Sequence, residues 1–375
     1  MNCMKIQYSR AMVPAAPSLP PLQPAKGRGS ASSPAHRFAV HQREPFDDGW
    51  DPSDPAYRAA PTPLTQVRWE DPRSAIAYNG SPDIGFDRSV NPYRGCEHGC
   101  SYCYARPSHS YLGLSPGLDF ETVIVAKRGL ADRLRLELGR PGYEPATLAI
   151  GTVTDAYQPI ERDLRLTRAV LEVLHAAQHP WALVTKGSGV ERDLDLIGPM
   201  GQAGQAAVYL TITTLDAGLA RRLEPRAPAP WRRLRTIRTL AQAGVPVGVS
   251  VAPQIPFLND DMEQVLAAAR EAGATRAFYT VLRLPWELGP LFREWLQLHY
   301  PDRAARVMAR IQDLRGGRDY DSDFAQRMTG QGIWADLLRQ RFHKACARLG
   351  YQREVRPLDA SAFRPPGGGA QMALF

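Results

Sequence analysis

The sequence predicts an α/β fold in which parallel strands and helices alternate as a full or partial (β/α) barrel. Short β-branched or apolar runs alternate with amphipathic stretches at least five times after about residue 84, and this alternation is typical of parallel βα units. Two of the amphipathic stretches end at glycines, Gly244 and Gly273, as helices commonly do.

The expected elements follow one another in a regular order. Strands are expected at residues 86–90, 123–126, 147–153, 181–185, 207–213, 245–251 and 276–282, and helices at 164–177, 192–203, 231–243 and 260–272. In barrels of this kind the chemistry lies on loops at the C-terminal ends of the strands. The loop after the first expected strand is therefore a candidate active-site loop.

The chain divides into four regions by composition. Residues 1–66 form a proline-rich arm, which we expect to be largely disordered. Residues 67–284 form the barrel with its lead-in, where Trp69 and Tyr78 should be buried. Residues 285–363 form a helical extension, with helices near 288–299, 302–314 and 323–349, and residues 364–375 form a flexible tail.

Charge and hydropathy narrow the classes of function. No apolar run reaches the length of a membrane span, and the N-terminus lacks a secretory signal pattern, so we expect a cytoplasmic protein with no membrane partner. The formal net charge is +8, carried mostly by arginine. A basic balance favours a nucleic-acid partner, but arginine on solvated faces explains it equally well.

Three of the five cysteines lie on one short segment: Cys96, Cys100 and Cys103, spaced Cys-x3-Cys-x2-Cys. An odd number of cysteines with three clustered argues against disulfides and for metal-binding thiols. Three thiolates can hold a metal centre and leave one coordination position open for a cofactor or substrate.

Two kinds of metal centre fit this spacing. A zinc site would need a fourth ligand, which His98 or His109 could supply. Glycines flank the ligands, so backbone N–H groups can approach sulfide, and tyrosines would keep the site partly dry. These features favour iron–sulfur. The flanking residues are Gly95, Gly99, Tyr93, Tyr102 and Tyr104.

With Tyr102 as the aromatic residue, the segment resembles the radical SAM signature Cys-x3-Cys-x-aromatic-Cys. The resemblance implies a partial (β/α)6-type barrel and a [4Fe–4S] cluster held by Cys96, Cys100 and Cys103. It implies S-adenosylmethionine on the fourth iron, whose reductive cleavage gives a 5′-deoxyadenosyl radical that abstracts hydrogen from substrate. It also implies a one-electron donor such as flavodoxin or ferredoxin.

More closely, the chain resembles the spore photoproduct lyase-like, "DNA repair photolyase"-type group. The shared motifs are Asn91-Pro92-Tyr93-Arg94-Gly95-Cys96, Tyr102-Cys103-Tyr104, Gly151-Thr152-Val153-Thr154-Asp155, Thr185-Lys186, Glu224-Pro225-Arg226 and Ala252-Pro253-x2-Pro256-x2-Asn259-Asp260. This resemblance implies that Tyr102 and Tyr104 are catalytic, lying near the cofactor and joining its radical relay. It implies that Lys186 contacts S-adenosylmethionine.

The sequence departs from that group in one respect. The lyase uses a cysteine as hydrogen donor after the strand that here spans residues 148–152, whereas this chain has no cysteine between Cys103 and Cys346. The hydrogen donor, and with it the lyase reaction, is therefore open.

Further candidates for binding the cofactor lie at expected strand ends. Thr152, Thr154 and Asp155 follow a buried strand and could bind the ribose or amino-acid part of the cofactor; alternatively, they form a βα turn in which Asp155 caps the next helix. Thr213 and Ser250 end later strands, where threonine and serine are also common as ordinary strand residues.

Two surface features bear on partners. Seven arginines crowd residues 221–238 and would bind phosphate or line a solvated helix face. The last residues resemble the bacterial sliding-clamp-binding peptide through Gln371, Leu374 and Phe375, offered at the end of a glycine tether.

We therefore expect a radical SAM enzyme that acts on DNA or another nucleic acid, in repair or modification. One alternative is radical SAM modification of a protein or small molecule. The other is a clamp-tethered iron–sulfur module that binds or senses redox state without catalysis.

Overall fold

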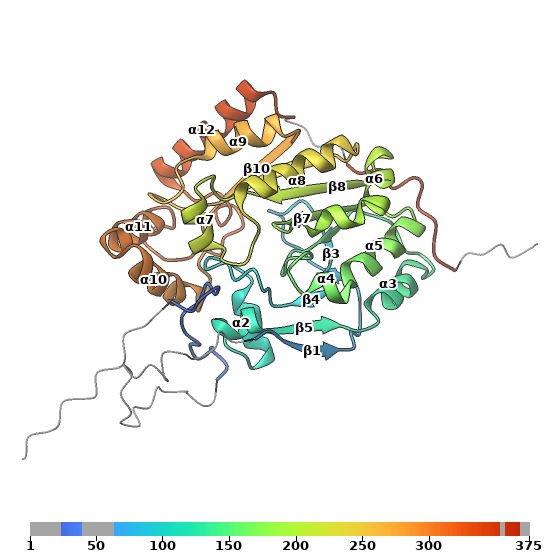
Figure 1. Ribbon diagram of the computed structural model, residues 1–375, viewed down its shortest axis with the longest axis horizontal. Coiled ribbons are helices and arrows are strands. Elements are labelled where there is room, and N and C mark those ends of the chain that lie inside the picture. The colour runs from blue at the N-terminus through green and yellow to red at the C-terminus, as the bar shows by residue number, and fades with distance from the viewer. Residues whose placement is uncertain (1–23, 40–63, 353–356, 368–375) are drawn as a thin grey trace, which may run out of the picture.

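Six parallel strands form one large sheet in the computed structural model, which describes residues 24–39, 64–352 and 357–367 (Figure 1). Their order is β10-β9-β8-β7-β6-β3, and β2 (Ala77–Tyr78) adds an antiparallel strand beside β3. Within the described ranges no pairing joins β10 to β2, so the sheet is open. The expected partial (β/α)6-type barrel is confirmed. The parallel strands are β3 (Arg88–Val90), β6 (Leu148–Ile150), β7 (Trp181–Thr185), β8 (Ala206–Thr211), β9 (Val247–Gln254) and β10 (Arg276–Val281).

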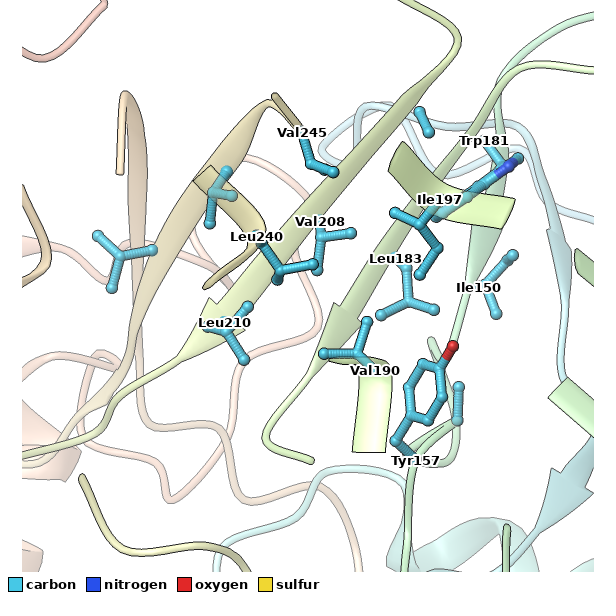
Figure 2. Close-up of a cluster of buried hydrophobic side chains, with 14 of the residues drawn as sticks. Ile150, Tyr157, Trp181, Leu183, Val190, Ile197, Val208, Leu210, Leu240 and Val245 are labelled. Carbon is cyan, nitrogen blue, oxygen red and sulfur yellow. The ribbon is translucent and has the colours of Figure 1, made fainter. Parts of the chain in front are cut away.

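Helices cover the outer face of this sheet, and the main core lies between them and the strands. Figure 2 shows Leu240 of α8 beside Val208 and Leu210 of β8, and Ile197 of α6 beside Leu183 of β7, all fully buried. Strands covered on both faces consist of apolar runs, as expected of a parallel sheet. The covering helices are α3 (Leu130–Leu138), α5 (Leu166–Ala176), α6 (Leu194–Gln202), α8 (Pro230–Gln242) and α9 (Met262–Glu271).

The parallel register brings the strand ends to one edge of the sheet. Ile150 pairs with Leu183, Thr185 with Leu210, and Thr211 with Ser250. The loops after these strands therefore gather at the same edge. Short elements in these loops are α4 (Glu161–Leu164), the 3-10 helix η2 (Ser188–Asp193) and α7 (Ala217–Leu223).

A second, three-stranded sheet carries the start of the cysteine segment, by which we mean residues 93–105 with Cys96, Cys100 and Cys103. Its order is β1-β5-β4, with β1 (Gln66–Glu70) parallel to β5 (Val123–Lys127) and β4 (Tyr93–Arg94) antiparallel to β5. The 3-10 helix η1 (Arg106–Leu112) and α2 (Leu118–Thr122) connect β4 to β5. The cysteine segment thus runs between the two sheets.

The expected burial of Trp69 and Tyr78 is wrong. Trp69 is 48% exposed and Tyr78 65% exposed. An arginine covers one face of each ring instead, with Arg128 5.6 Å from the Trp69 centroid and Arg88 5.6 Å from the Tyr78 centroid. Such contacts stabilise an aromatic ring at the surface without a core around it.

Three helices form the C-terminal extension: α10 (Leu288–His299), α11 (Pro301–Asp313) and α12 (Gly332–Leu349). The last begins later than the expected residue 323, because the preceding residues fold into turns. α12 packs beside α9, and its Phe342 ring lies 4.8 Å from Tyr279 of β10. Phe292 and Trp295 of α10 share a buried cluster with Cys100 and Tyr102. The extension therefore supports the cysteine segment directly.

Part of the proline-rich arm is folded against the domain. We call residues 24–39 the N-terminal strap; it lies between α2 and α10 in Figure 1. Arg28, Gly29 and Ser30 all bond to Glu121 of α2. The sequence predicts disorder for most of residues 1–66, but the strap packs on the domain. The other arm residues, 1–23 and 40–63, and the tail residues 368–375 lie outside the described ranges.

In the part of the chain that the structure describes, no helix is both long enough and apolar enough to cross a bilayer.

Candidate iron–sulfur and cofactor site

The cysteine segment follows β3 and is fixed along its length by backbone hydrogen bonds. The Cys96 N–H donates to Phe120 O at 2.9 Å, and Ser101 N–H donates to Leu223 O at 2.9 Å. Cys96 and Cys100 are buried, and Cys103 is half-buried. The segment therefore has a defined path before any metal is considered.

Burial makes the Cys96 and Cys100 thiols reluctant to ionise. It raises the pKa of Cys96 well above its ordinary value, and Asp155 adds to the effect. Burial also raises the pKa of Cys100 to about 12, although the Lys186 ammonium opposes the rise. Metal binding would therefore release protons from these thiols.

The donor set fits an iron–sulfur cluster with three protein ligands. Three thiols lie on one segment, and the other cysteine among the described residues, Cys346, packs against the barrel core on α12. Soft thiolate ligands suit iron–sulfur clusters. Within the same residues, no three His, Cys, Asp or Glu side chains converge on a position for a single ion.

Both histidines that could complete a zinc site have other contacts. His98 Nδ1 lies 3.2 Å from Asp155 Oδ2. His109 Nε2 lies 3.0 Å from Val123 O, and its ring meets Phe120 edge-on at 5.2 Å. Each histidine is thereby tied to protein groups on a neighbouring segment.

Gly99 allows the N-terminal strap to approach the cysteine segment closely. A Cβ atom on Gly29 of the strap would lie 1.7 Å from Gly99 O, and Gly99 itself has a φ of +65°. Glycine accepts both the close approach and the left-handed conformation. The strap therefore contacts the cysteine segment backbone to backbone.

The loop after β6 carries three of the expected cofactor-binding residues. Asn91 Oδ1 accepts from the Thr152 N–H at 2.9 Å, and Thr154 Oγ1 donates to Gly95 O at 2.6 Å. The Tyr104 hydroxyl donates to Thr152 O. This loop and the cysteine segment thus form one hydrogen-bonded unit.

Asp155 connects three parts of the site. One carboxylate oxygen accepts from Tyr157 N at 2.9 Å and from Thr185 Oγ1 at 2.5 Å, and the other accepts from Lys186 N at 2.8 Å. Burial alone would raise the pKa of Asp155, but His98 and these donors lower it below its ordinary value. Asp155 is therefore a largely buried carboxylate that joins the ends of β6 and β7.

Lys186 is a partly buried cation of the site. Its Nζ lies 5.7 Å from the centroid of the Tyr102 ring. Burial alone would lower the pKa of Lys186, but Cys100, Glu224 and Asp155 raise it above its ordinary value. An ammonium group surrounded by such partners stays charged and can meet a carboxylate.

Glu224 is the centre of a second buried network, which sequence reasoning missed. It accepts from the Tyr102 hydroxyl, from Thr213 Oγ1 at 2.6 Å and from the buried Arg233 guanidinium. Burial alone would raise the pKa of Glu224, but Arg233 and Lys186 lower it to about 2. The signal was present in the sequence, since Glu224 opens one of the motifs quoted above.

Thr213 and Ser250, both expected at strand ends, have different positions relative to their strands. Thr213 directly contacts Tyr102, with 3.0 Å between the hydroxyl oxygens. Ser250 was expected at a strand end, but β9 continues to Gln254, so Ser250 is a buried residue within the strand. Its main-chain oxygen accepts from Ile212 N at 3.0 Å, as a ladder residue does.

The crowded arginines of residues 221–238 pair with protein groups. Arg226 lies 3.2 Å from Glu97, Arg232 lies 2.6 Å from Glu191, and Arg233 pairs with Glu224. The structure therefore favours neither phosphate binding nor a simply solvated helix face for these three.

Tyr104 lies at the open side of the site. It is 46% exposed, and the Arg283 guanidinium lies 4.5 Å from its ring centroid. Tyr102, by contrast, is 6% exposed and faces Glu224. The two expected catalytic tyrosines therefore occupy opposite environments. Gln371, Leu374 and Phe375 of the expected clamp-binding peptide lie outside the described residues.

Comparison with known proteins finds a family match in the central part of the chain. Residues 90–269 match the Radical SAM superfamily. An uncharacterized protein of Mycobacterium tuberculosis is 38% identical over 226 residues, which cover 60% of this chain and 66% of that protein. An uncharacterized protein of Methanocaldococcus jannaschii is 28% identical over 213 residues, covering 57% and 76%. This chain thus spans just under two thirds of the mycobacterial relative.

A solved structure shares the fold. Spore photoproduct lyase complexed with dinucleoside spore photoproduct superposes with a TM-score of 0.50, covering 76% of this chain and 80% of that one. The sequence identity is 17%, so this likeness concerns the fold.

Proposed function

The chain contains a radical SAM domain, and from this premise we propose that it is an enzyme that cleaves S-adenosylmethionine reductively and acts on a nucleic acid. The superfamily uses a [4Fe–4S] cluster and S-adenosylmethionine. When bound, these supply a carbon radical that removes hydrogen from a C–H bond. The observation that carries the proposal is the matching domain, in which three cysteines lie on one short segment after β3, at the sheet edge where barrel enzymes react.

We assign a separate role to each residue of the site. Cys96, Cys100 and Cys103 would hold the cluster. The Lys186 ammonium, whose pKa is raised by its neighbours, would meet the cofactor carboxylate. Tyr102, held by Glu224, would close the inner side of the site, and Tyr104 would face the substrate.

The strand-end loops would position the rest of the cofactor. The β6 loop is rigid because Asn91, Gly95 and Tyr104 bond to it. We propose that Thr152, Thr154 and Asp155 of this loop contact the ribose or amino-acid part, together with Thr213, which follows β8, and Ser250, which lies within β9. Pre-organised contacts of this kind hold a reactive carbon near one C–H bond and exclude water.

Two facts support a nucleic acid as the substrate. The structural neighbour was solved with a dinucleoside photoproduct, and this chain carries a net charge of +8, which favours polyanions. An arginine also stacks on Tyr104 at the open side of the site. Repair or modification of a nucleic acid is the reaction class that these observations favour.

The experiment is anaerobic cluster reconstitution followed by dithionite and S-adenosylmethionine, with 5′-deoxyadenosine measured with and without ultraviolet-damaged DNA. Cys100→Ala should abolish product and reduce the iron and sulfide content. Cys346→Ala is the matched control, because that thiol packs on α12, and it should retain both.

Each other outcome has a clear meaning. If no nucleic acid changes the amount of 5′-deoxyadenosine formed, but a protein or small molecule does, the substrate is a protein or small molecule and not a nucleic acid. If the iron-loaded protein does not cleave the cofactor, the protein is a binding or redox-sensing module and not a radical SAM enzyme.

We also propose two partners. A flavodoxin or ferredoxin would supply the electron, as the superfamily requires a reductant. The tail would bind the sliding clamp through Gln371, Leu374 and Phe375, and its Gln-x2-Leu-Phe pattern supports this. Deleting residues 371–375 should abolish clamp binding in a pull-down and leave cofactor cleavage unchanged; unchanged clamp binding would refute the assignment.

A further inference from the structure

Three exposed aromatic rings gather around one arginine at the surface. The Arg37 guanidinium lies 4.4 Å from the Trp286 ring centroid, 4.7 Å from that of Phe38 and 5.2 Å from that of Tyr111. The Phe38 and Tyr111 rings are themselves 5.2 Å apart. We call Phe38, Tyr111 and Trp286 the aromatic surface.

The rings of this surface are open to solvent. Trp286 is 61% exposed, Tyr111 66% and Phe38 52%. Arg37 itself is fixed by a two-point contact with Glu287, at 2.8 and 3.0 Å. Large apolar rings that are grouped and exposed mark a surface that binds something.

The aromatic surface is connected to the open side of the proposed active site through the loop after β10. Trp286 lies in the loop after β10, and Tyr111 belongs to η1, just after the cysteine segment. Arg283, in the same loop as Trp286, stacks on Tyr104 at 4.5 Å. Tyr104 in turn bonds to Thr152. A ligand that extends from the site toward η1 would meet these rings.

Three arginines lie among these rings: Arg37, which pairs with Glu287, Arg327, which pairs with Asp83, and Arg283. Arg283 and Arg327 both act electrostatically on Tyr104. Arg327 also stacks on Phe324, whose ring is 45% exposed, at 4.6 Å. Alternating arginines and aromatic rings attract a phosphate backbone and offer flat faces to its bases.

We propose that the aromatic surface stacks unpaired bases next to the nucleotide that enters the site. The inference rests on the proposed nucleic-acid substrate and adds its form, which is single-stranded or locally opened. In a duplex the base faces are stacked on one another, so these rings would have nothing to stack against. Base–aromatic stacking tolerates any sequence, because every base has a flat face.

The alternative occupant is a protein, such as the electron donor. Acidic proteins would also be attracted here, but they need no row of flat rings. Stacked arginine–aromatic pairs favour bases over a protein surface, and the experiment separates the two.

The test is fluorescence anisotropy with a short labelled single-stranded oligonucleotide and with the same sequence as a duplex. Trp286→Ala and Tyr111→Ala should each weaken single-strand binding on the order of tenfold, as expected for losing one stacking ring. Both should change duplex binding little. Trp286→Phe should restore most of the affinity, because it restores a flat ring.

Trp69→Ala is the matched control. Trp69 is also an exposed tryptophan, 48% exposed with an arginine 5.6 Å from its ring, but it lies on β1 of the smaller sheet. It should bind both probes as the unaltered protein does. Circular dichroism and thermal melting would establish that each variant is folded.

The outcomes separate this inference from the proposed function. If the unaltered protein binds neither probe at low salt, the nucleic-acid substrate fails. If it binds but Trp286→Ala and Tyr111→Ala bind equally well, or Trp69→Ala is weakened as much, the aromatic surface is refuted. If these variants lose affinity for reduced flavodoxin and keep it for the oligonucleotide, the surface is a protein-docking site and the inference is overturned.

Discussion

Replacing Gly29 with alanine should detach the N-terminal strap from the cysteine segment. The added Cβ would lie 1.7 Å from Gly99 O and 3.2 Å from Ser101 N, far inside contact distance. Both neighbours are backbone atoms, so no side-chain rotation can relieve the clash. The strap must therefore move.

The cost can be estimated from the bonds that this movement breaks. The Gly29 and Ser30 N–H groups donate to the two oxygens of Glu121 at 3.0 and 2.9 Å. Glu121 is fully buried, and a hydrogen bond to a charged group contributes about 1.5–3 kcal/mol. Losing both bonds would therefore cost about 3–6 kcal/mol of local stability. Even the lower figure corresponds to roughly a hundredfold rise in the open population of the strap.

Limited proteolysis with trypsin measures that population. Arg28 is 8% exposed in the closed form, so cleavage after Arg28 requires the strap to open. We expect Gly29→Ala to be cut about a hundred times faster than the unaltered protein. The reconstituted variant should also lose cluster absorbance faster in air.

Two glycines provide matched controls for this variant. A Cβ on Gly80 or Gly85 would meet nothing within 4 Å, so Gly80→Ala and Gly85→Ala should be cut after Arg28 at the original rate. If Gly29→Ala is cut no faster than these controls, the strap does not depend on the close approach to Gly99, and the reasoning is wrong.

Three further changes test the buried charges. Arg233→Met leaves Glu224 buried and unpaired and should lower the free energy of unfolding in urea by about 3–5 kcal/mol; Arg232→Met, which breaks a pair nearer the surface, should cost about 1 kcal/mol or less, and equal costs would contradict the assignment. Burial lowers the pKa of His179 from 6.5 to about 4, so the unfolded chain binds the proton more readily, and stability should fall by up to about 3 kcal/mol as pH drops from 6.5 to 4. His179→Gln should remove that part of the pH dependence of the free energy of unfolding, measured by urea titration. If this free energy varies with pH in the variant as it does in the unaltered protein, the role of His179 is contradicted. Asp155→Asn should weaken S-adenosylmethionine binding to the reconstituted protein by equilibrium dialysis, because it loosens the joint between β6 and β7; unaltered affinity would contradict that role.

Local sequence patterns were sufficient for the barrel. The strand at residues 181–185 was predicted with the bounds that the structure gives, because a buried parallel strand is a short apolar run between turns. The cysteine spacing likewise identified the domain. Both signals are contained within a few consecutive residues.

Contacts between distant segments could not be predicted in this way. Gly29 meets Glu121 across 92 residues, and nothing in a proline-rich stretch indicates such a partner. Ser250 was misplaced because the strand continues three residues beyond its expected end at 251. Trp69 was expected in a core because tryptophan side chains tend to be buried. Its arginine partner, Arg128, lies on a different segment of the chain and could not be foreseen.

Long-range contacts of this kind also fix the position of the cysteine segment. Four carboxylates meet around it: Glu97, Glu121, Asp155 and Glu224, and each contacts a cationic or histidine side chain. Three of the four come from outside the segment, from α2, the β6 loop and the end of α7. A buried ion pair adds little net stability, but it penalises any arrangement that leaves one partner alone. The path of the cysteine segment is thus specified by the contacts of Glu97 with Arg226 and of His98 with Asp155, and by the hydrogen bond from Tyr102 to Glu224.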